Sequence, residues 1–384
     1  MKRITQLLLL TLFLGLTTQC TKDDNTDADM SAVKENYAAM ALANYTDAHT
    51  AAQTLQTAIT AFVSNPSATT MATAKQAWLD AREPYGQSEA FRFSGGPIDE
   101  YGEAPEGNLN AWPLDESYID YVEGNATSGI INDTTQTISK DNLASLNEEG
   151  GETNISIGYH AIEFLLWGQD VTSPSAETAG QRSYLDFAAG QGNGNEVRRG
   201  EYLAVASELI IDQLAYLIGE WETSGSYYKA FMAEDHAETV KNLFQSIAIF
   251  SKGELAGERI IVAYTNQDQE DEHSCFSDNT HRDVILNQKG IGNIFMGTYG
   301  TVSGKSLYDL IKAENETLAE ETKLLVTQSA TEATSLYTPF DVAISNPTYR
   351  PDVLNLGNSL KSLGDKIVEC GTTLGFTISA DLPE

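Results

Sequence analysis

The chain has 384 residues and is strongly acidic, with 23 Lys and Arg residues against 55 Asp and Glu residues and a formal net charge of -32 at pH 7. This balance argues against nucleic acid and anionic lipid surfaces as partners, because both repel a negatively charged protein. Cations are the natural partners, but an acidic surface usually serves solubility alone, so a cation site requires a specific cluster of ligands.

The N-terminus has the pattern of a secretory signal. Residues 1–19 begin with Lys2 and Arg3 and continue through an apolar run, Leu7 to Leu16, that is too short to span a membrane. Cys20 follows directly and resembles the acceptor cysteine of a bacterial lipoprotein, whose sulfur takes a diacylglycerol before the signal is removed. We therefore expect a lipoprotein signal peptide over 1–19, and the alternative is a plain signal peptide with an unmodified cysteine.

Residues 20–30 are polar and charged, which predicts a flexible tether. Within them, Lys22-Asp23-Asp24 resembles the short signal that sends Bacteroidota lipoproteins to the outer face of the outer membrane. No later segment reaches about 18 uninterrupted apolar residues, the length that a spanning helix needs. The expected location is the outer membrane, with the protein held by its lipid alone and facing the periplasm or the cell surface.

Apolar residues recur at spacings of three and four along most of the chain, which predicts amphipathic helices and an all-α fold. Ser306 and Asp309 have the spacing of an N-terminal capping box. The predicted helices are 31–63, 68–92, 155–167, 196–222, 229–263, 306–334 and 352–373. The predicted long connections, which are typical places for functional residues, are 94–109, 124–152, 190–195, 265–278 and 290–304.

The mature chain is long enough for two domains with separate cores. We predict a first helical bundle over 31–225 and a second over 226–384. Residues 63–67 and 344–348 share the pattern apolar-Ser-Asn-Pro-Ser/Thr between two helices, which suits two bundles related by an internal duplication.

Two cysteines remain once Cys20 is set aside. A disulfide between Cys275 and Cys370 would close a loop of about 95 residues and stabilise the fold by roughly 4 kcal/mol. The spacing alone leaves the pairing open.

The sharpest local motif is Gly158-Tyr159-His160-Ala161-Ile162-Glu163. On a helix, His160 and Glu163 project from one face and can share a metal ion or a proton. The surrounding segment is almost wholly apolar, so an ionised carboxylate there must be compensated. The alternative is a hydrogen-bonded His-Glu pair that serves the core alone.

A second cluster of acids and imidazoles occupies residues 268–283. Carboxylate oxygens with imidazoles suit iron or manganese, or zinc with fewer oxygens. The run lacks the central glycine and ligand spacing of an EF-hand loop. Asp268, Asp271 and His273 are the candidate ligands, and the alternative is a solvated charged surface.

Other charged residues stand at helical spacing near these motifs. Glu89 and Arg82 lie on adjacent turns, Asp115 follows a Trp-Pro-Leu segment, and Glu254 lies one turn before Glu258. Each of these alone is typical of packing or ion pairing.

Several segments together resemble the imelysin-like family. Residues 158–163 match its Gly-x-His-x-x-Glu signature, and residues 110–115, 254–259 and 268–283 resemble its iron-regulated protein A branch in the same order. The resemblance implies two helical bundles with the His-x-x-Glu site near where they meet. It also implies an envelope protein linked to iron uptake.

We therefore expect a metal site at His160 and Glu163, with Glu89 as the added carboxylate. The weaker candidate ligands are Asp115, Glu254, Asp268, Asp271 and His273. Arg82 and Arg259 are expected to orient carboxylates without touching the metal. Iron is the expected metal and zinc is the alternative.

The expected function is metal binding in iron acquisition or delivery, with an envelope transport partner, and with affinity falling as the pH drops through the histidine range. Free ion, chelate and haem stay open as the form in which iron arrives. The family is also catalogued among metallopeptidases, but the chain has no His-Glu-x-x-His, and Phe164 follows Glu163 where His-x-x-Glu-His would need histidine. An enzyme is therefore the second hypothesis, and a structural or adhesive lipoprotein is the third.

Overall fold

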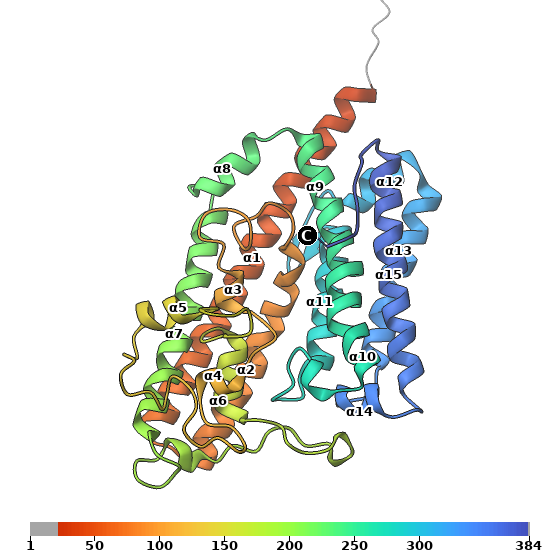
Figure 1. Ribbon diagram of the computed structural model, residues 1–384. Coiled ribbons are helices and arrows are strands. Elements are labelled where there is room, and N and C mark those ends of the chain that lie inside the picture. Colours follow the sequence, from red (N-terminus) through yellow and green to blue (C-terminus); the bar gives the residue numbers. More distant parts are fainter. Residues whose placement is uncertain (1–21, 383–384) are drawn as a thin grey trace, which may run out of the picture.

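The computed structural model describes residues 22–382, so the predicted signal peptide and the lipid acceptor Cys20 lie outside the described part of the chain (Figure 1). Within it, nearly every regular element is a helix. The one sheet in this range is an antiparallel pair of two-residue strands, in which Thr298 pairs with Ser303 and Tyr299 with Val302. The predicted all-α fold is confirmed.

The bounds of the elements are as follows. The first half contains α1 (Lys22–Ser64), α2 (Ala68–Ser88), η1 (Glu89–Phe91), α3 (Glu106–Leu109), α4 (Glu116–Ile119), α5 (Lys140–Leu146), α6 (Tyr159–Trp167), η2 (Pro174–Ala176), η3 (Tyr184–Phe187) and α7 (Glu196–Trp221). The second half contains α8 (Ser226–Ala233), α9 (His236–Ile249), the π-helix η4 (Phe250–Val262), α10 (Ala263–Asn266), η5 (Gln269–Asp271), α11 (Thr280–Met296), β1 (Thr298–Tyr299), β2 (Val302–Ser303), α12 (Leu307–Glu314), α13 (Glu316–Ser335), α14 (Phe340–Ser345) and α15 (Arg350–Thr373).

The long helices stand in two groups side by side (Figure 1). Helices α1, α2 and α7 pack together in one group, and η4, α11, α13 and α15 pack together in the other. The two groups share one continuous cluster of buried apolar side chains, which includes Tyr37 of α1, Leu165 of α6 and Leu360 of α15. The predicted division into domains at residue 225 and the internal duplication stay predictions.

Helix α1 begins earlier than the sequence suggests. It starts at Lys22, inside the predicted tether, and Met30 is already buried. Asp27 lies 3.1 Å from Nδ1 of His236, and Asp29 lies 2.9 Å from Nζ of Lys305. These contacts to distant elements give the polar segment partners that a local reading cannot see, so residues 22–30 are helical where the sequence predicted a tether.

Helix α11 is the largest element that the sequence reading missed. Gly290 and Gly292 made residues 290–304 resemble a loop, whereas the helix continues to Met296. A Cβ atom at Gly290 would lie 2.4 Å from the carbonyl oxygen of Gln87, so the absence of a side chain lets α11 pack directly against the end of α2. The predicted helix 229–263 is also divided, because Asp235 caps a new helix after α8 ends.

One stretch, Glu196–Ala233, is long and apolar enough by composition to cross a membrane. It consists of two helices, α7 and α8, separated by a turn. Leu203, Ile210 and Leu214 of α7 are fully buried, and α7 packs on α1. This stretch therefore has the packing of a core helix.

Cys275 and Cys370 are both free thiols. Cys275 is half-buried, whereas Cys370 is buried in α15 with its Sγ atom 3.2 Å from the hydroxyl oxygen of Thr322. The structure therefore contains no disulfide between them.

Candidate metal centre

Helix α6 carries the His-Glu motif into the interior between the two groups of helices. Every residue from Tyr159 to Trp167 is buried. Gly158, which precedes the helix, has φ +92°, and a Cβ atom there would lie 2.8 Å from the carbonyl oxygen of Leu109. The motif therefore needs glycine for both its backbone conformation and its close approach to the neighbouring chain.

His160 and Glu163 form a buried hydrogen-bonded pair. Nδ1 of His160 lies 2.9 Å from Oε2 of Glu163. The other carboxylate oxygen, Oε1, accepts hydrogen bonds from the backbone N–H and the hydroxyl group of Ser277, at 2.9 and 2.7 Å. Both oxygens of Glu163 are thus engaged. In contrast, Nε2 of His160 is buried and has no hydrogen-bonding partner.

His273 forms a matching pair with Asp283. Its Nδ1 lies 2.8 Å from Oδ2 of Asp283, and Arg82 donates to Oδ1 of the same carboxylate at 3.0 Å. The rings of His160 and His273 meet edge to face with their centroids 4.6 Å apart. In the tautomer whose Nδ1–H group donates to Asp283, the Nε2 atom of His273 carries the lone pair, and the amide nitrogen of Asn110 lies 3.4 Å from it.

Burial sets the charge of these groups. It lowers the pKa of His160 and that of His273 to about 3, so both imidazoles are neutral at physiological pH. Burial raises the pKa of Glu163 to about 8. Burial also opposes ionisation of Asp283, but the Arg82 guanidinium outweighs it and holds the pKa of Asp283 well below its usual range. Metal affinity was expected to fall through the ordinary histidine range, and that expectation stays a prediction; neutral imidazoles favour a loss at lower pH.

Three buried or nearly buried arginines neutralise the carboxylates around the two histidines. We call these side chains the arginine network, and its members are Arg82, Arg92, Arg259, Glu89, Glu254 and Asp283. Arg259 donates to Glu89 at 2.7 Å and to Glu254 at 2.8 Å. Arg92 donates to Glu254 at 3.1 Å. Asn110 connects the network, because it accepts from Arg82 at 2.5 Å and donates to Glu89 at 3.1 Å.

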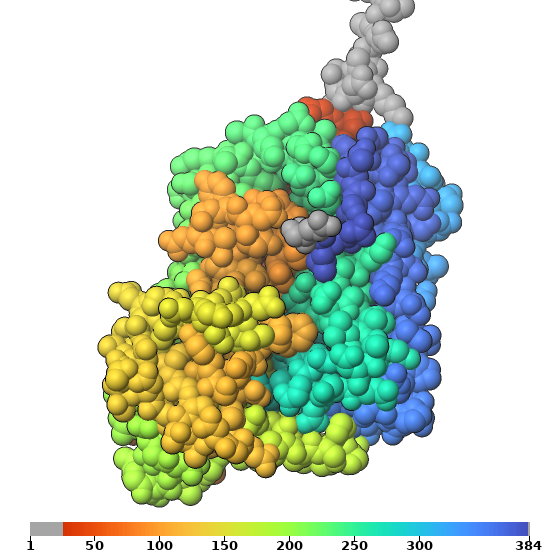
Figure 2. All heavy atoms as spheres, in the orientation of Figure 1, coloured from red at the N-terminus to blue at the C-terminus, as the bar shows by residue number. Residues whose placement is uncertain are grey.

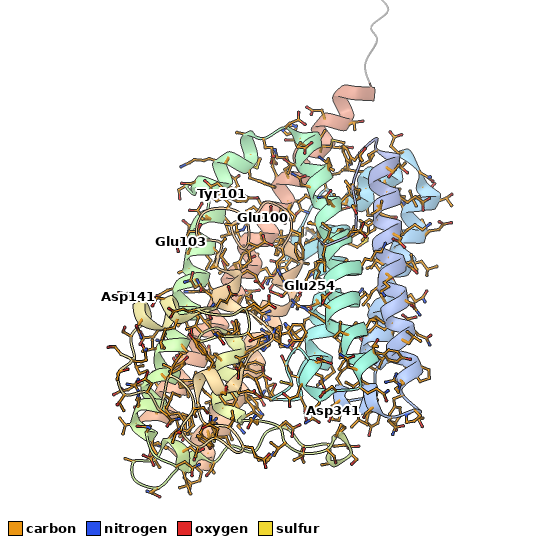
Figure 3. All side chains as sticks on the ribbon, viewed as in Figure 1. Glu100, Tyr101, Glu103, Asp141, Glu254 and Asp341 are labelled. Atoms are coloured by element: carbon orange, nitrogen blue, oxygen red, sulfur yellow. The ribbon has the colours of Figure 1, made fainter. Side chains whose placement is uncertain are left out.

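The arginine network borders a cavity of about 330 Å³. Its lining includes His273, Trp112, Glu106 and Glu254. Figure 3 shows Glu254 on the π-helix η4, between the two groups of helices. The indole N–H of Trp112 donates to the backbone oxygen of Glu272 at 3.0 Å, which fixes the aromatic wall next to His273. Of the two histidines, His273 is the one that lines this cavity, so a ligand in the cavity would meet His273 first.

Comparison with known proteins identifies the family. The family model described as imelysin, peptidase family M75, matches residues 41–367. The chain belongs to the imelysin family. It is 24% identical over 331 residues to iron-regulated protein A of Synechococcus elongatus, covering 84% of this chain and 80% of that protein.

A solved structure from Parabacteroides distasonis, of a protein classed as an iron-regulated protein A precursor, has the same fold as this imelysin-family chain. The TM-score is 0.69 at 20% sequence identity, and the match covers 90% of this chain and 95% of that one. The predicted family resemblance is confirmed.

The structure places seven of the predicted site residues in one buried hydrogen-bonded region: Arg82, Glu89, His160, Glu163, Glu254, Arg259 and His273. The other three candidates have local roles. Asp115 caps α4 by accepting from Ser117, Asp268 caps η5, and Asp271 accepts from Asn266 at 2.7 Å. These three therefore do not join the imelysin motif.

Sequence reasoning missed Asp283, which holds the imidazole of His273 in place, and Ser277, which holds the motif glutamate. It also missed Asn110 as a connector. Asn110 and Asp283 fall inside segments that resembled the family, so the family pattern was the available signal. Local spacing gave none, because each partner lies far away in the chain or on a different element.

Only two protein ligands are offered by the histidine pair. Among residues 22–382, no third His, Cys, Asp or Glu completes a group around His160 and His273 in which all ligand atoms lie within 4.8 Å of one another. The donor set therefore fits a metal that keeps water or a small chelating molecule in its remaining positions.

Proposed function

We propose that the protein binds a metal ion, iron, through the Nε2 atoms of His160 and His273, and that it acts in iron acquisition or delivery at the cell envelope. Membership of the imelysin family and the names of the relatives associate the chain with an iron-related or a metallopeptidase role. The iron-binding role is the one that the donor set supports best.

The observation that carries the proposal is the buried, unpartnered Nε2 atom of His160 beside a second neutral imidazole. A buried nitrogen without a hydrogen bond is costly unless something binds it. Each imidazole is held at Nδ1 by an acidic side chain, which is the usual support of a metal-binding histidine, because it fixes the ring and, when it accepts from Nδ1–H, leaves Nε2 as the ligand atom. Both rings are neutral, as metal binding requires.

The other residues of the motif act through the histidines. Glu163 uses both oxygens for His160 and Ser277, so we assign it the role of orienting His160 rather than that of a ligand. Arg82 does the same for Asp283 and thereby for His273. Glu89 and Glu254 form ion pairs with Arg259, which largely neutralise their negative charge.

The proposed location is the outer membrane, through a lipid on Cys20. Substitution of Cys20 by Ser should release the protein into the soluble envelope fraction, whereas the wild-type chain should stay with membranes until detergent is added. Equal membrane association of both proteins would contradict the anchor.

The test of iron binding is metal content and anaerobic titration with ferrous iron of the purified protein. We expect equimolar iron for the wild type, affinity lower by about a hundredfold for His160→Ala and for His273→Ala, and lower by about tenfold for Glu163→Gln. His49→Ala is the matched control, since His49 lies on α1 outside the network. Equal stoichiometry and affinity in wild type, His160→Ala and His273→Ala would overturn the site.

A metallopeptidase is the second candidate. The family description favours it, and so does a carboxyl group, Glu163, with a pKa raised to about 8 by burial beside a histidine. A zinc peptidase usually has three protein ligands and an open position, whereas this pair offers two. Zinc-dependent hydrolysis of an unfolded protein, lost in His160→Ala, would promote this role. Loss of stability without any metal phenotype would favour a structural or adhesive protein.

A further inference from the structure

A second group of acidic side chains lies where three distant segments meet. One ligand oxygen from each of Asp170, Asp278 and Asp341 lies within 4.8 Å of the other two. Asp170 follows α6, Asp278 precedes α11, and Asp341 lies in the first turn of α14. Figure 2 shows the yellow-green segment after α6 reaching across the base of the molecule toward the side built by α11 and α14.

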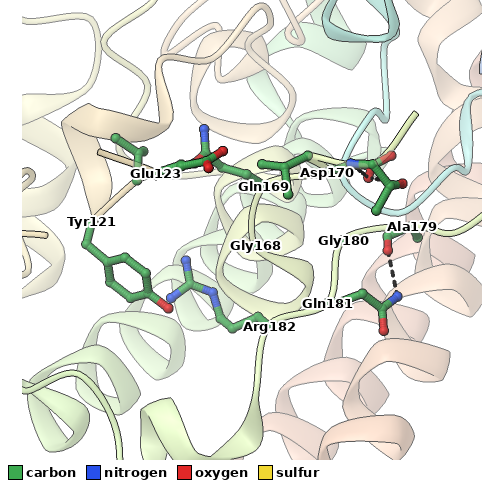
Figure 4. Close-up of a pocket in the computed structure, with 12 residues that line it drawn as sticks. Tyr121, Glu123, Gly168, Gln169, Asp170, Ala179, Gly180, Gln181 and Arg182 are labelled. Carbon is green, nitrogen blue, oxygen red and sulfur yellow. Dashed lines mark hydrogen bonds between the residues drawn. The ribbon is translucent and has the colours of Figure 1, made fainter. Parts of the chain in front are cut away.

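Among the residues described, no Lys or Arg forms an ion pair with Asp170, Asp278 or Asp341. The guanidinium of Arg182 lies in the same pocket as Asp170, but it points toward Tyr121 and pairs with Asp120 at 2.7 Å (Figure 4). Three carboxylates at this spacing repel one another, and a cation bound among them would remove the repulsion.

Two further side chains leave oxygen atoms without partners in the same region. Glu272 is 1% exposed, and neither of its carboxylate oxygens has a hydrogen bond of normal geometry. Burial, and then the charges of Asp341 and Asp278, raise the pKa of Glu272 well above its usual range, so its carboxyl group lies in the field of the other two. Gln269 donates its amide to the backbone oxygen of Asp170 at 2.8 Å and leaves its own Oε1 buried and unpaired.

We propose that Asp170, Asp278 and Asp341, with Glu272 beside them, bind a hard divalent cation, calcium; we call these four residues the acidic cluster. Two ligands on opposite sides of a calcium ion are about 4.8 Å apart, because calcium–oxygen distances are about 2.4 Å. All offered atoms are oxygens, and the ligands come from loops and a helix end that can accommodate the six to eight ligands that calcium takes. Magnesium fits less well, since it demands a tighter octahedron and keeps its waters.

The charges agree with this assignment. Burial and then the neighbouring carboxylates raise the pKa of Asp278 to about 7, and burial with the charge of Asp170 raises the pKa of Asp341 to about 6. A bound cation would reverse both shifts and supply the partner that Glu272 lacks.

The acidic cluster is separate from the histidine pair, but two of its residues lie on the loop that carries His273. Glu272 precedes His273, and Asp278 follows Ser277, which holds Glu163. A cation there would tie this loop to the segments that carry Asp170 and Asp341. The calcium proposal does not depend on iron binding, because the two sites share no ligand.

The test is calorimetric titration of the EDTA-treated purified protein with calcium chloride, with the melting temperature measured in parallel. We expect equimolar binding and a higher melting temperature with calcium. Asp278→Asn and Asp341→Asn keep the shape of each side chain but remove its charge, so each should weaken calcium binding by about tenfold or more. Without calcium, both variants should melt at or above the wild-type temperature, which shows that they fold.

Asp268→Asn is the matched control, because Asp268 belongs to the same acidic run but is exposed and caps η5. It and His160→Ala should bind calcium as the wild type does, and Asp341→Asn should bind iron as the wild type does. Absence of calcium binding in the wild type at millimolar concentration, or equal affinity in Asp268→Asn and Asp341→Asn, would overturn the proposal. Loss of iron binding in every protein with calcium binding intact would overturn only the iron site.

Discussion

The arginine network and the acidic cluster bury similar numbers of carboxylates but treat their charge in opposite ways. In the first, Glu89, Glu254 and Asp283 each lie against a guanidinium within 3.1 Å. In the second, no ion pair with Lys or Arg is present in the described part of the chain. Carboxylates that already neutralise arginines are poor metal ligands, which leaves the histidines as the donors there. The acidic cluster keeps its charge available for a cation.

The largest expected effect comes from opening the arginine network. Arg82 is fully buried, and its removal in Arg82→Met leaves Asp283 as an uncompensated buried charge. We expect the free energy of unfolding to fall by about 3–5 kcal/mol, as for other broken buried ion pairs. Urea unfolding at pH 7 measures this change.

Arg282→Met is the matched control for that substitution. Arg282 also pairs with a carboxylate through two short hydrogen bonds, to Glu83 at 2.8 and 2.7 Å, but both side chains are more than one third exposed. Its loss should change the unfolding free energy by about 1 kcal/mol or less. Equal losses in the two variants would mean that burial does not separate the two kinds of pair.

A smaller effect with a defined pH dependence is expected for Glu254→Gln. Burial opposes ionisation of Glu254, but Arg259 and Arg92 outweigh it and lower its pKa to about 2, against an ordinary value of 4.5. The folded state therefore gains stability above pH 4.5 and loses it as the pH falls toward 2. The variant should be less stable by roughly 2–3 kcal/mol at pH 7, and the gap should close in acid. A gap that is constant from pH 7 to pH 3 would refute this assignment.

The acidic cluster should respond with the opposite sign. The pKa of Asp341 is raised to about 6 from an ordinary 3.8, so the folded state loses stability as the pH rises from about 4 to 6, and the full penalty applies above that range. Asp341→Asn should raise the melting temperature of the calcium-free protein at pH 8 by a few degrees and leave it unchanged at pH 3. A lower melting temperature at pH 8 would contradict the repulsion.

The smallest expected effect is that the imidazoles of His160 and His273 do not titrate near neutral pH. Burial lowers the pKa of His160 and His273 to about 3, so their imidazole NMR signals should keep neutral-form shifts from pH 8 down to about pH 4. In the unfolded chain these histidines take up a proton at their ordinary pKa of about 6.5, whereas in the folded protein they stay neutral. The fold should therefore lose stability as the pH falls from about 6.5. Protonation of either ring near pH 6 would mean that water reaches the pair.

Local patterns predicted the features that depend on local geometry. Helical spacing placed His160 and Glu163 on one face, and Ser306 with Asp309 forms the capping box that their spacing indicates. Helical spacing also singled out Glu89 beside Arg82, and Arg259 lies in a segment that resembled the family. Helix α11 was not predicted, because Gly290 resembles a loop residue in the sequence. Its role, a close approach of α11 to α2, is visible only in the tertiary structure.

The acidic run shows why the rest of the site could not be predicted. Asp268, Asp271, His273 and Asp278 look alike as potential ligands in the sequence, yet they diverge in the structure. His273 points toward α6, Asp278 joins Asp170 and Asp341 from two other segments, and Asp268 and Asp271 form local turns. Their roles depend on partners that are distant along the chain, and spacing carries no information about those partners.

The most direct test of the central claim is X-ray absorption at the iron edge of the iron-loaded protein, because it separates imidazole ligands from an all-oxygen shell. The account predicts outer-shell scattering from two imidazoles in the wild type, from one in His273→Ala, and unchanged scattering in Asp341→Asn. An all-oxygen shell in the wild type, or loss of the signal in Asp341→Asn, would contradict iron binding at the histidine pair.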